Sequence, residues 1–377
     1  MPESIALYFH IPFCRSKCGY CSFVSFAGRE DIIPAYLGAL KKEIKRKSRK
    51  NPVRSIYFGG GTPSLLTPAQ IGEVIATARA CFPVAGHAEI SLEANPGTVD
   101  SSYLKDIRES GVNRLSIGLQ SFHNAELSLL GRIHTTDKGT DAFDAARMAG
   151  FQNINIDLMY GLPGQNEALW LESLESAIRL GPEHLSLYAL TLEDDAPMAQ
   201  VLKGRGSQPP LPDTAANQYE LAVDMLAGAG FVHYEISNWA KPGRECRHNL
   251  VYWKNLHYLG LGLTAHSWFD HRRYANTADL ESYLNTVWDM PDRAVEIAEE
   301  ISSELELAET IILGLRLGEG ISEEAVNRRF GVDVRSRYRA QIDELVELRL
   351  IECADGHIRL TERGQLLGNE VFWRFLP

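Results

Sequence analysis

Hydrophobic positions in the first half of the chain follow two patterns that alternate. Short apolar runs of strand character are each followed by a segment whose apolar residues recur at helical spacing. We predict strands at residues 5–11, 53–61, 88–96, 112–120, 153–161 and 184–192. Strands that alternate with helices form a parallel sheet, and six such units in about 190 residues predict an α/β fold, a partial (β/α)6 barrel.

The pattern changes in the last third of the chain. Residues 236–290 are dense in aromatic residues and histidines, and the chain beyond them is helical and charged. It then gives "LIECADGHIRLT", in which Asp355 and Gly356 predict a tight hairpin turn and Thr361 the cap of a final helix. We therefore predict a core barrel at 1–235, an aromatic segment at 236–290 and a small α+β domain resembling a winged helix at 291–377.

Charge and composition narrow the class of protein. The 377 residues carry a formal net charge of −11, which argues against a nucleic-acid partner. The basic run at 41–50 follows apolar residues at helical spacing and predicts the exposed end of a helix. No apolar run approaches the roughly 20 residues that span a bilayer, and the N-terminus lacks a signal-peptide pattern. We expect a cytoplasmic protein without a transmembrane segment, and peripheral membrane contact stays open.

Three cysteines, Cys14, Cys18 and Cys21, lie close together after the first predicted strand. A zinc site usually needs four ligands, and a catalytic dithiol needs only a C-x-x-C pair. Three thiolates can instead hold three irons of a [4Fe–4S] cube and leave the fourth iron free for a small molecule. The pattern favours such a cluster over its alternatives, a structural zinc or inert thiols.

Other polar residues lie at the carboxyl ends of the predicted strands, where barrels of this kind place their active sites. The glycine-rich stretch 59–63 follows the second strand and lets the backbone approach a ligand closely. Glu93, Gln120, Arg132 and Asp157 lie on or just beyond the next three strands. Acids of this kind can bind sugar hydroxyls, and arginine can bind a carboxylate.

The spacing C-x3-C-x2-C is similar to the signature of the radical SAM superfamily, whose members bind S-adenosylmethionine (SAM). Nearly the whole chain then resembles the HemW family of haem chaperones, which is close to the oxygen-independent coproporphyrinogen III oxidases. The resemblance is carried by "LYFHIPFC", "YFGGGTPS", "EANPGT", "RLSIGLQSF", "LGRIHT", "NIDLMYGLPGQ", "YEISNWAKPGRECRHNLVYW" and "LTERGQLLGNEVF". It implies a radical SAM barrel with a [4Fe–4S] cluster, SAM and haem as its cofactors.

The resemblance also implies roles for single residues. Cys14, Cys18 and Cys21 match the cluster ligands. The positions that match SAM contacts are Tyr8, Tyr20, Gly60, Gly61, Thr62, Glu93, Gln120, Arg132, Asp157 and Ala189. In this superfamily one electron from the cluster cleaves SAM and releases a 5′-deoxyadenosyl radical, so an electron donor is an implied partner.

A haem motif is implied at residues 248–253, which match H-N-x-x-Y-W of the chaperones. The residues concerned are His248, Asn249, Tyr252 and Trp253. Imidazole is an ordinary axial ligand of haem iron, and aromatic rings suit a porphyrin plane. Without the resemblance, the two polar residues would be assigned to the surface and the two aromatics to the core. Cys246 is a further candidate ligand, although a buried inert thiol is the simpler interpretation.

Two features favour a chaperone over an oxidase. The oxidases carry a further cysteine two positions after the third one, where this chain has Phe23, and a longer segment before the cluster than the 13 residues here. We expect a haem chaperone that passes haem to an acceptor, a respiratory haem protein. The alternatives are a coproporphyrinogen oxidase that decarboxylates propionates, and an iron–sulfur scaffold without radical activity. The acceptor, covalent haem attachment, the oligomeric state and the need for SAM cleavage, and with it enzymatic activity, stay open.

Overall fold

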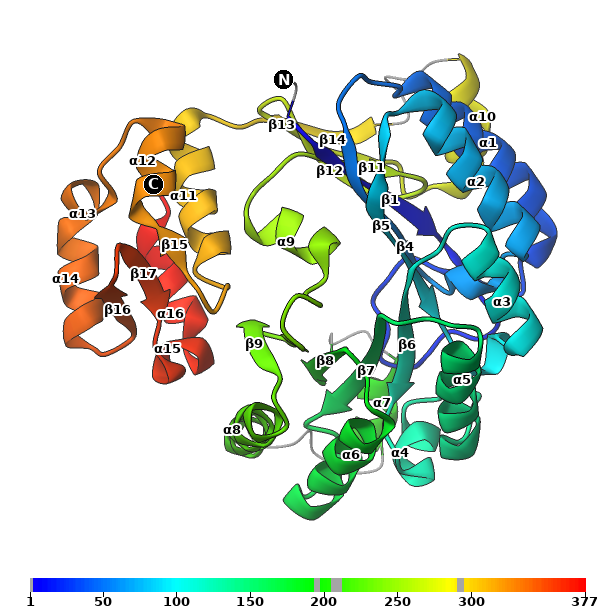
Figure 1. The fold of residues 1–377 in the computed structure, drawn as a ribbon, viewed down its shortest axis with the longest axis horizontal. Coiled ribbons are helices and arrows are strands. Elements are labelled where there is room, and N and C mark those ends of the chain that lie inside the picture. The colour runs from blue at the N-terminus through cyan, green and yellow to red at the C-terminus, as the bar shows by residue number, and fades with distance from the viewer. Residues whose placement is uncertain (1–2, 193–196, 205–211, 290–294) are drawn as a thin grey trace.

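Six parallel strands from the N-terminal half form the centre of one large twisted sheet (Figure 1). The computed structural model describes residues 3–192, 197–204, 212–289 and 295–377. The six strands are β1 (Ile5–Ile11), β4 (Val53–Gly60), β5 (Val84–Ala94), β6 (Arg114–Gln120), β7 (Ile154–Tyr160) and β8 (His184–Ala189). Each pairs in parallel with the next, so the predicted strands are confirmed in place and in order.

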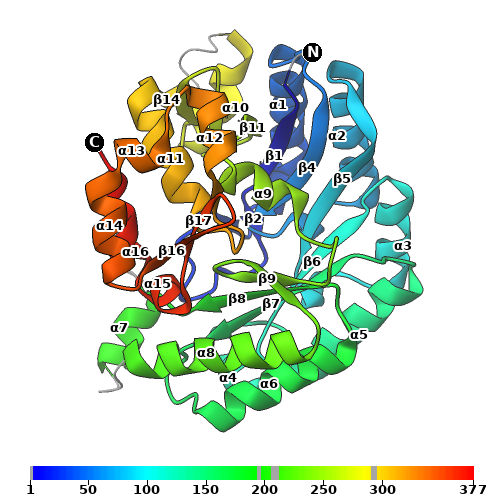
Figure 2. The ribbon, with the colours of Figure 1, turned by 60° about the vertical axis from the view of Figure 1, so that its left-hand side comes forward.

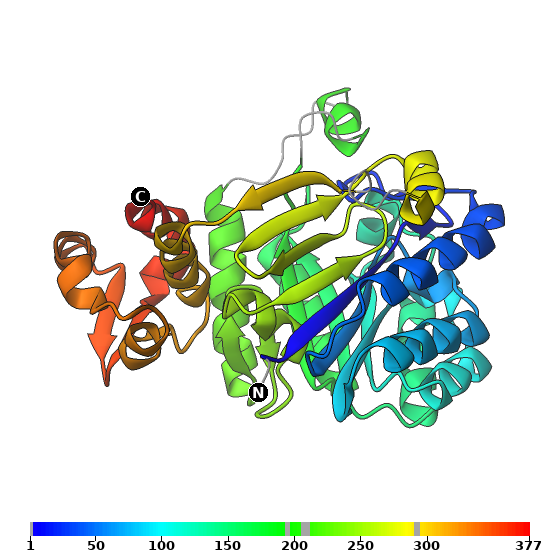
Figure 3. The same ribbon diagram turned by 90° about the horizontal axis from the view of Figure 1, so that it is seen from above.

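Further strands extend this sheet at both edges. Beside β1 lie β11 (Tyr258–Leu261), β12 (His266–Phe269), β13 (Arg272–Asn276) and β14 (Val295–Glu300). Beyond β8 lies β10 (Asn238–Ala240), which is antiparallel to β8, and then β9 (Val232–Glu235), which is antiparallel to β10. In the described part of the chain β14 and β9 end the strand order without pairing to each other. The sheet is therefore curved but open, which confirms the partial barrel (Figure 3).

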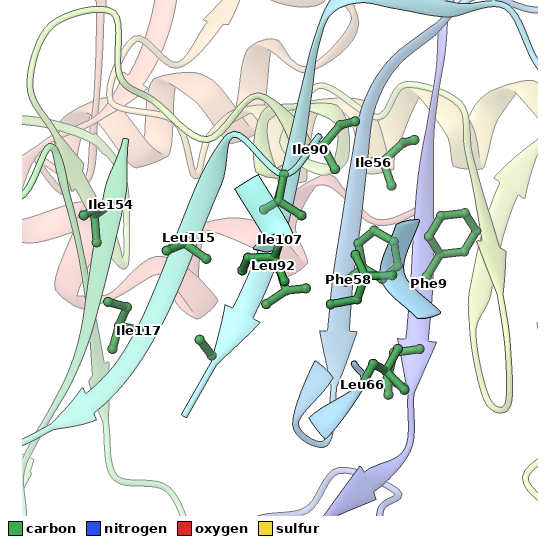
Figure 4. Packing of buried hydrophobic residues seen from close by; sticks show 14 of the residues in the cluster. Phe9, Ile56, Phe58, Leu66, Ile90, Leu92, Ile107, Leu115, Ile117 and Ile154 are labelled. Atoms are coloured by element: carbon green, nitrogen blue, oxygen red, sulfur yellow. The ribbon is translucent and has the colours of Figure 1, made fainter. Parts of the chain in front are cut away.

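Helices cover the outer face of the sheet. They are α1 (Ile33–Arg46), α2 (Pro68–Cys81), α3 (Ser101–Glu109), α4 (Asn124–Leu129), α5 (Thr136–Met148), α6 (Glu167–Leu180), α8 (Pro212–Gly228) and α10 (Leu280–Asp289). Helix α7 (Pro197–Gly204) lies instead beside the cysteine-bearing segment, where the Met198 backbone N–H donates to the Gly19 carbonyl. Buried apolar side chains such as Phe9, Phe58 and Leu92 fill the space between the layers (Figure 4). As predicted, α1 buries an apolar face and ends in basic residues. Since this outer layer holds the core, the concave face is left for polar side chains.

The C-terminal part has its own apolar core, which begins at Leu307. Its helices are α11 (Ser303–Gly314), α12 (Glu323–Phe330), α13 (Val334–Arg337), α14 (Arg339–Glu347), α15 (Glu362–Leu366) and α16 (Gly368–Phe372), followed by the 3-10 turn η5 (Trp373–Phe375). Its small sheet has the order β15 (Ile321–Ser322), β17 (His357–Leu360), β16 (Ile351–Ala354). This confirms the α+β domain that resembles a winged helix.

Local predictions for this domain also hold. The hairpin turns at Asp355 and Gly356, whose φ angles are 51° and 72° as a tight turn of this type requires. The Thr361 side chain accepts a hydrogen bond from the Gly364 backbone and caps α15. The division at 1–235, 236–290 and 291–377 stays a prediction: β14 continues the large sheet to Glu300, and residues 290–294 lie outside the described residues.

Helix α9 (Arg247–Trp253) lies between the large sheet and the C-terminal helices (Figure 2). It follows β10 in the chain and contacts β1 and β4 on one side and α11 on the other. The predicted haem motif is therefore at the junction of the two cores. Of the helices in the described ranges, none combines the length and the apolar character needed to cross a membrane.

Candidate functional site

The cysteine loop is closed at its base by a short parallel pairing of β2 (Phe13–Cys14) with β3 (Phe26–Ala27). His10, on β1, lies 3.2 Å from the Val24 carbonyl oxygen through its Nε2 and holds the returning end of the loop. Inside the loop the Cys21 backbone N–H donates to the Cys18 carbonyl and forms a tight turn. Cys14, Cys18 and Cys21 are thus presented from one compact loop at the carboxyl end of β1, as the sequence predicts.

Two side chains donate hydrogen bonds to these sulfurs. The Thr62 hydroxyl lies 3.6 Å from Cys14 Sγ, and Arg132 Nη1 lies 3.5 Å from Cys18 Sγ. Burial raises the pKa of the Cys21 thiol, and the neighbouring Cys18 and Cys14 raise it further. Thiols that repel one another as anions suit an iron cluster, whose positive charge offsets that repulsion.

The backbone of the glycine-rich stretch packs directly on the cysteine loop. A Cβ atom on Gly61 would lie 2.7 Å from the Phe13 carbonyl oxygen and 3.0 Å from Cys14 Sγ, so only glycine fits there. Among the described residues no three histidine, cysteine or acidic side chains are grouped to hold a single metal ion. In a [4Fe–4S] cube each thiolate binds a different iron, so the sulfurs need not meet at one point. The loop therefore fits a cluster.

A cavity of about 550 Å³, which we call the inner cavity, opens on the concave face of the sheet. Its lining brings together the cysteines, every predicted SAM contact and three residues of the predicted haem motif. They are Tyr8, Cys14, Cys18, Tyr20, Cys21, Gly60, Gly61, Thr62, Glu93, Gln120, Arg132, Asp157, Ala189, His248, Asn249 and Tyr252. Tyr8 and Tyr252, which are 244 positions apart in the chain, therefore share one site.

Two carboxyl groups, those of Glu93 and Asp157, lie in the lining of the inner cavity. Burial, with the nearby Asp157 adding to it, raises the pKa of Glu93 to about 7, although the Tyr57 hydroxyl donates to Glu93 at 2.9 Å. Burial also raises the pKa of Asp157, opposed by hydrogen bonds from Asn155 at 2.7 Å and Ser116 at 3.1 Å. A positively charged ligand would lower the pKa of both carboxyl groups, and the two carboxylates would bind it.

Arg132 and Gln120 also line this cavity. Arg132 is fixed by its hydrogen bonds to Cys18 Sγ and to the Gly118 carbonyl at 2.8 Å, while its buried Nε has no hydrogen-bond partner. Gln120 ends β6 with a φ angle of 71°, a left-handed conformation that costs a non-glycine residue energy. Strain of this kind is common at functional sites.

Several lining residues were missed by the sequence analysis. They are Tyr57, Arg114, Ser116, Asn155 and Ser186, all on the inward positions of β4, β6, β7 and β8. Arg114 is fully buried, and its charge lowers the pKa of both Glu93 and Asp157. The available signal was the alternation within two of these strands: Asn155 lies two positions before Asp157, and Arg114 lies two positions before Ser116.

The start of α9 is held inside the barrel by Glu89. Its carboxylate accepts hydrogen bonds from the backbone N–H groups of Arg247 and His248, both at 3.1 Å. Cys246 precedes the helix, with its Sγ 3.5 Å from Glu89, and burial raises the pKa of this thiol to about 12. Cys246 is therefore a buried, protonated thiol, which agrees with the simpler interpretation of this residue.

The four residues of the predicted haem motif do not share one environment. His248 is buried, with Nδ1 at 3.0 Å from the Ser55 hydroxyl and Nε2 at 2.8 Å from the Tyr252 hydroxyl. Burial, and then the charge of Arg114, lower the pKa of His248 to about 3, so its imidazole is neutral. Trp253 is absent from the lining of the inner cavity and stacks instead with the guanidinium of Arg316, 4.8 Å from its ring centre.

Comparison with known proteins agrees with this geometry. Residues 8–177 match the model of the radical SAM superfamily, and residues 301–367 match that of the HemN C-terminal domain. The chain is 35% identical over 376 residues to the heme chaperone HemW of Bacillus subtilis, with 98% of each chain covered. It is 36% identical to the heme chaperone HemW of Escherichia coli, covering 99% of this chain and 98% of that one.

The chain belongs to the HemW family. Its fold is also that of the solved coproporphyrinogen III oxidase HemN of Escherichia coli, with a TM-score of 0.86 over 99% of this chain and 90% of that one. The identity there is only 24%, so this likeness shows the fold alone. Membership of the HemW family confirms the resemblance drawn from the sequence.

Phe23, the residue that turned the sequence interpretation away from the oxidases, lines the mouth of the inner cavity. The residue is 65% exposed. The membership of the HemW family agrees with that interpretation. The individual roles of the SAM and haem residues stay predictions.

Proposed function

We propose that the chain is a haem chaperone, which binds haem and transfers it to an acceptor protein, and which carries a [4Fe–4S] cluster with SAM. The observation that carries this proposal is the near full-length similarity to proteins named heme chaperone HemW. It is supported by the position of residues 248–253 on α9, beside the cavity lined by the cysteines.

Cys14, Cys18 and Cys21 would hold the cluster, and the remaining polar residues of the inner cavity would bind SAM. When bound, the cluster supplies one electron for reductive cleavage of SAM. SAM carries a positive sulfonium and a positive ammonium group, which suit the carboxyl groups of Glu93 and Asp157. The fork of Arg132 suits its carboxylate. The residues thus complement each charged part of that molecule.

Haem is the cargo in this proposal, and the neutral imidazole of His248 is the side chain of α9 best suited to its iron. Both ring nitrogens of His248 already have partners, Ser55 and Tyr252. Ligation through Nε2 therefore requires the Tyr252 hydroxyl to move and its hydrogen bond to be replaced by the bond to iron. A carrier that must release its cargo benefits from such a competing partner.

The proposal extends to location and partners. The protein is proposed to be cytoplasmic, because the cytoplasm keeps thiols such as the three clustered cysteines reduced. An electron donor would serve the cluster, and a haem protein of the respiratory type would accept the cargo. The net charge of −11 gives no support to a nucleic-acid partner.

A haem transfer experiment tests this function. The protein is reconstituted anaerobically with iron and sulfide, loaded with one equivalent of haem, and mixed with an apo-haem protein of different absorbance. We expect a haem absorbance band on loading and its transfer to the acceptor. A reconstituted protein that binds SAM but takes up no haem would overturn the proposal.

A further inference from the structure

Helix α9 separates the inner cavity from a second cavity of about 750 Å³, which we call the outer cavity. The outer cavity lies between β11, β12 and β13 of the large sheet on one side and α11, α16 and η5 of the C-terminal domain on the other. Tyr252 lines both cavities. The haem motif thus faces two spaces, and the sequence does not indicate which of them takes the porphyrin.

The walls of the outer cavity are aromatic and aliphatic. Tyr258 and Trp268 come from the sheet, Phe372 and Trp373 from the C-terminal end, and α11 adds two aliphatic residues, Ile312 and Leu313. Trp373 is 54% exposed, so the cavity is open to solvent along one side. Flat apolar walls of this size match a planar aromatic macrocycle, and the volume falls within the range of ordinary ligand sites.

The polar groups of the outer cavity are few and lie among these rings. Arg273 donates two hydrogen bonds to Glu309, at 2.6 and 2.7 Å, and its guanidinium lies 5.7 Å from the centre of the Trp268 ring. Asn369 adds an amide group, while the buried Asn255 already donates from its Nδ2 to Thr310 Oγ1 at 3.0 Å. Arginine and amides are the partners that the acidic side chains of a porphyrin require, and Glu309 is the group such an acid would displace.

The two cavities differ in what they can hold. The inner cavity is lined by the three cysteines, by Glu93 and Asp157, and by two arginines, so the cluster and SAM account for its chemistry. Among the described residues, the lining of the outer cavity holds no cysteine, and its one arginine and one carboxylate, Arg273 and Glu309, are paired with each other. Trp253 lines neither cavity, but it stacks on Arg316, which also lies over Phe372 of the outer cavity at 5.6 Å.

We propose that the outer cavity is the porphyrin site, with the macrocycle between Trp268 and the C-terminal aromatics and Tyr252 at its inner edge. The C-terminal domain is then half of the haem site. His248 positions the Tyr252 hydroxyl from the other side of this cavity, and its Nε2 reaches the haem iron only when that hydroxyl moves away. This inference rests on the proposed function, because it gives the haem a place within the same chain.

The test fills one cavity at a time with the same side chain. Leu313→Trp places an indole in the outer cavity, and Asn249→Trp places one in the inner cavity. Ser303→Trp is the matched control on α11, at an exposed position outside the cavity. Each full-length variant is titrated with haem and with metal-free protoporphyrin, followed by absorbance and by quenching of tryptophan fluorescence. Melting curves show that each variant is folded.

The proposal predicts that Leu313→Trp lowers the affinity for both ligands at least tenfold, and more than Asn249→Trp does, while Ser303→Trp binds as the original protein does. Ile312→Trp repeats the test if Leu313→Trp fails to fold. A loss in Asn249→Trp that equals or exceeds the loss in Leu313→Trp overturns the outer cavity as the site and leaves the proposed function standing. An original protein that binds neither ligand overturns both.

Discussion

The Nε2 atom of His248 lies 2.8 Å from the hydroxyl group of Tyr252, one helical turn further along α9. This hydrogen bond joins a histidine that lines only the inner cavity to a tyrosine that lines both cavities. It therefore couples the space where a cluster and SAM fit to the space whose walls suit a porphyrin. A change at either residue is expected to reach the other.

Replacing His248 by alanine is expected to weaken haem binding at least tenfold, because Tyr252 loses the partner that orients it. The same change leaves the Ser55 and Tyr252 hydroxyls without a partner, at a cost of about 1–3 kcal/mol in unfolding free energy. A haem titration and urea unfolding measure the two effects. Ser55→Ala removes only the other hydrogen bond of the ring and serves as the control. Unchanged haem affinity in His248→Ala would count against any role of the motif histidine.

The lowered pKa of His248 makes stability depend on pH. Folding disfavours its protonation, so the stabilisation is present above pH 6.5 and is lost as the pH falls towards the folded value of about 3. His248→Gln keeps a neutral polar group and lacks this loss. Between pH 6.5 and 4.5 the original protein should lose about 2 kcal/mol more unfolding free energy than the variant. If the unfolding free energies of the original protein and of His248→Gln fall equally with pH, His248 is not buried as described.

Glu93 has the opposite dependence. Its pKa is raised to about 7, so the stability it contributes is present below pH 4.5 and is lost as the pH rises through 7. Glu93→Gln should therefore unfold at a higher temperature than the original protein at pH 8 and at a similar one at pH 4.5. The variant should also bind SAM at least tenfold more weakly by calorimetry. Full SAM affinity would remove Glu93 from the binding site.

The cysteine assignment predicts which thiols carry iron. Alanine at Cys14, Cys18 or Cys21 should reduce iron after reconstitution from about four atoms per chain to a small fraction of that. Cys246→Ala should retain the iron, because that thiol is buried against Glu89. Iron and sulfide analysis measures both, and loss of iron in Cys246→Ala would require a different ligand set.

The packing of Gly61 on the cysteine loop predicts a steric effect. Gly61→Ala places a methyl group against the Phe13 carbonyl and Cys14 Sγ, and should destabilise the protein by about 1–3 kcal/mol and lower its iron content. Gly86→Ala is the matched control, since nothing lies within 4 Å of the added atom. Equal melting temperatures for the two variants would contradict the close approach.

Much of this architecture could be predicted because local patterns specify it. The strands begin and end where apolar runs do, and Asp355 and Gly356 form the turn that their conformational preferences favour. The cluster-binding loop could be predicted from the spacing of Cys14, Cys18 and Cys21. Tyr57 and Arg114 were missed because a polar residue inside a strand has no visible partner until β4, β5 and β6 are paired.

The outer cavity could not be predicted for a related reason. Tyr258, Leu313 and Trp373 belong to three segments that are apolar in the ordinary way of core residues. Only the packing of the C-terminal domain beside α9 leaves a space between them. Likewise, the sequence places Tyr252 and Trp253 next to each other, and only the helix shows that Trp253 faces Arg316 instead of the inner cavity.

A parallel assay on one reconstituted sample tests the central claim most directly. Protein with a complete cluster is given SAM and a reductant without oxygen, then divided between a haem transfer assay and a coproporphyrinogen decarboxylation assay. We predict one haem bound per chain and passed to an apo-haem protein, with no protoporphyrinogen formed. Conversion of coproporphyrinogen to protoporphyrinogen without stable haem binding would contradict the account and identify the chain as an oxidase.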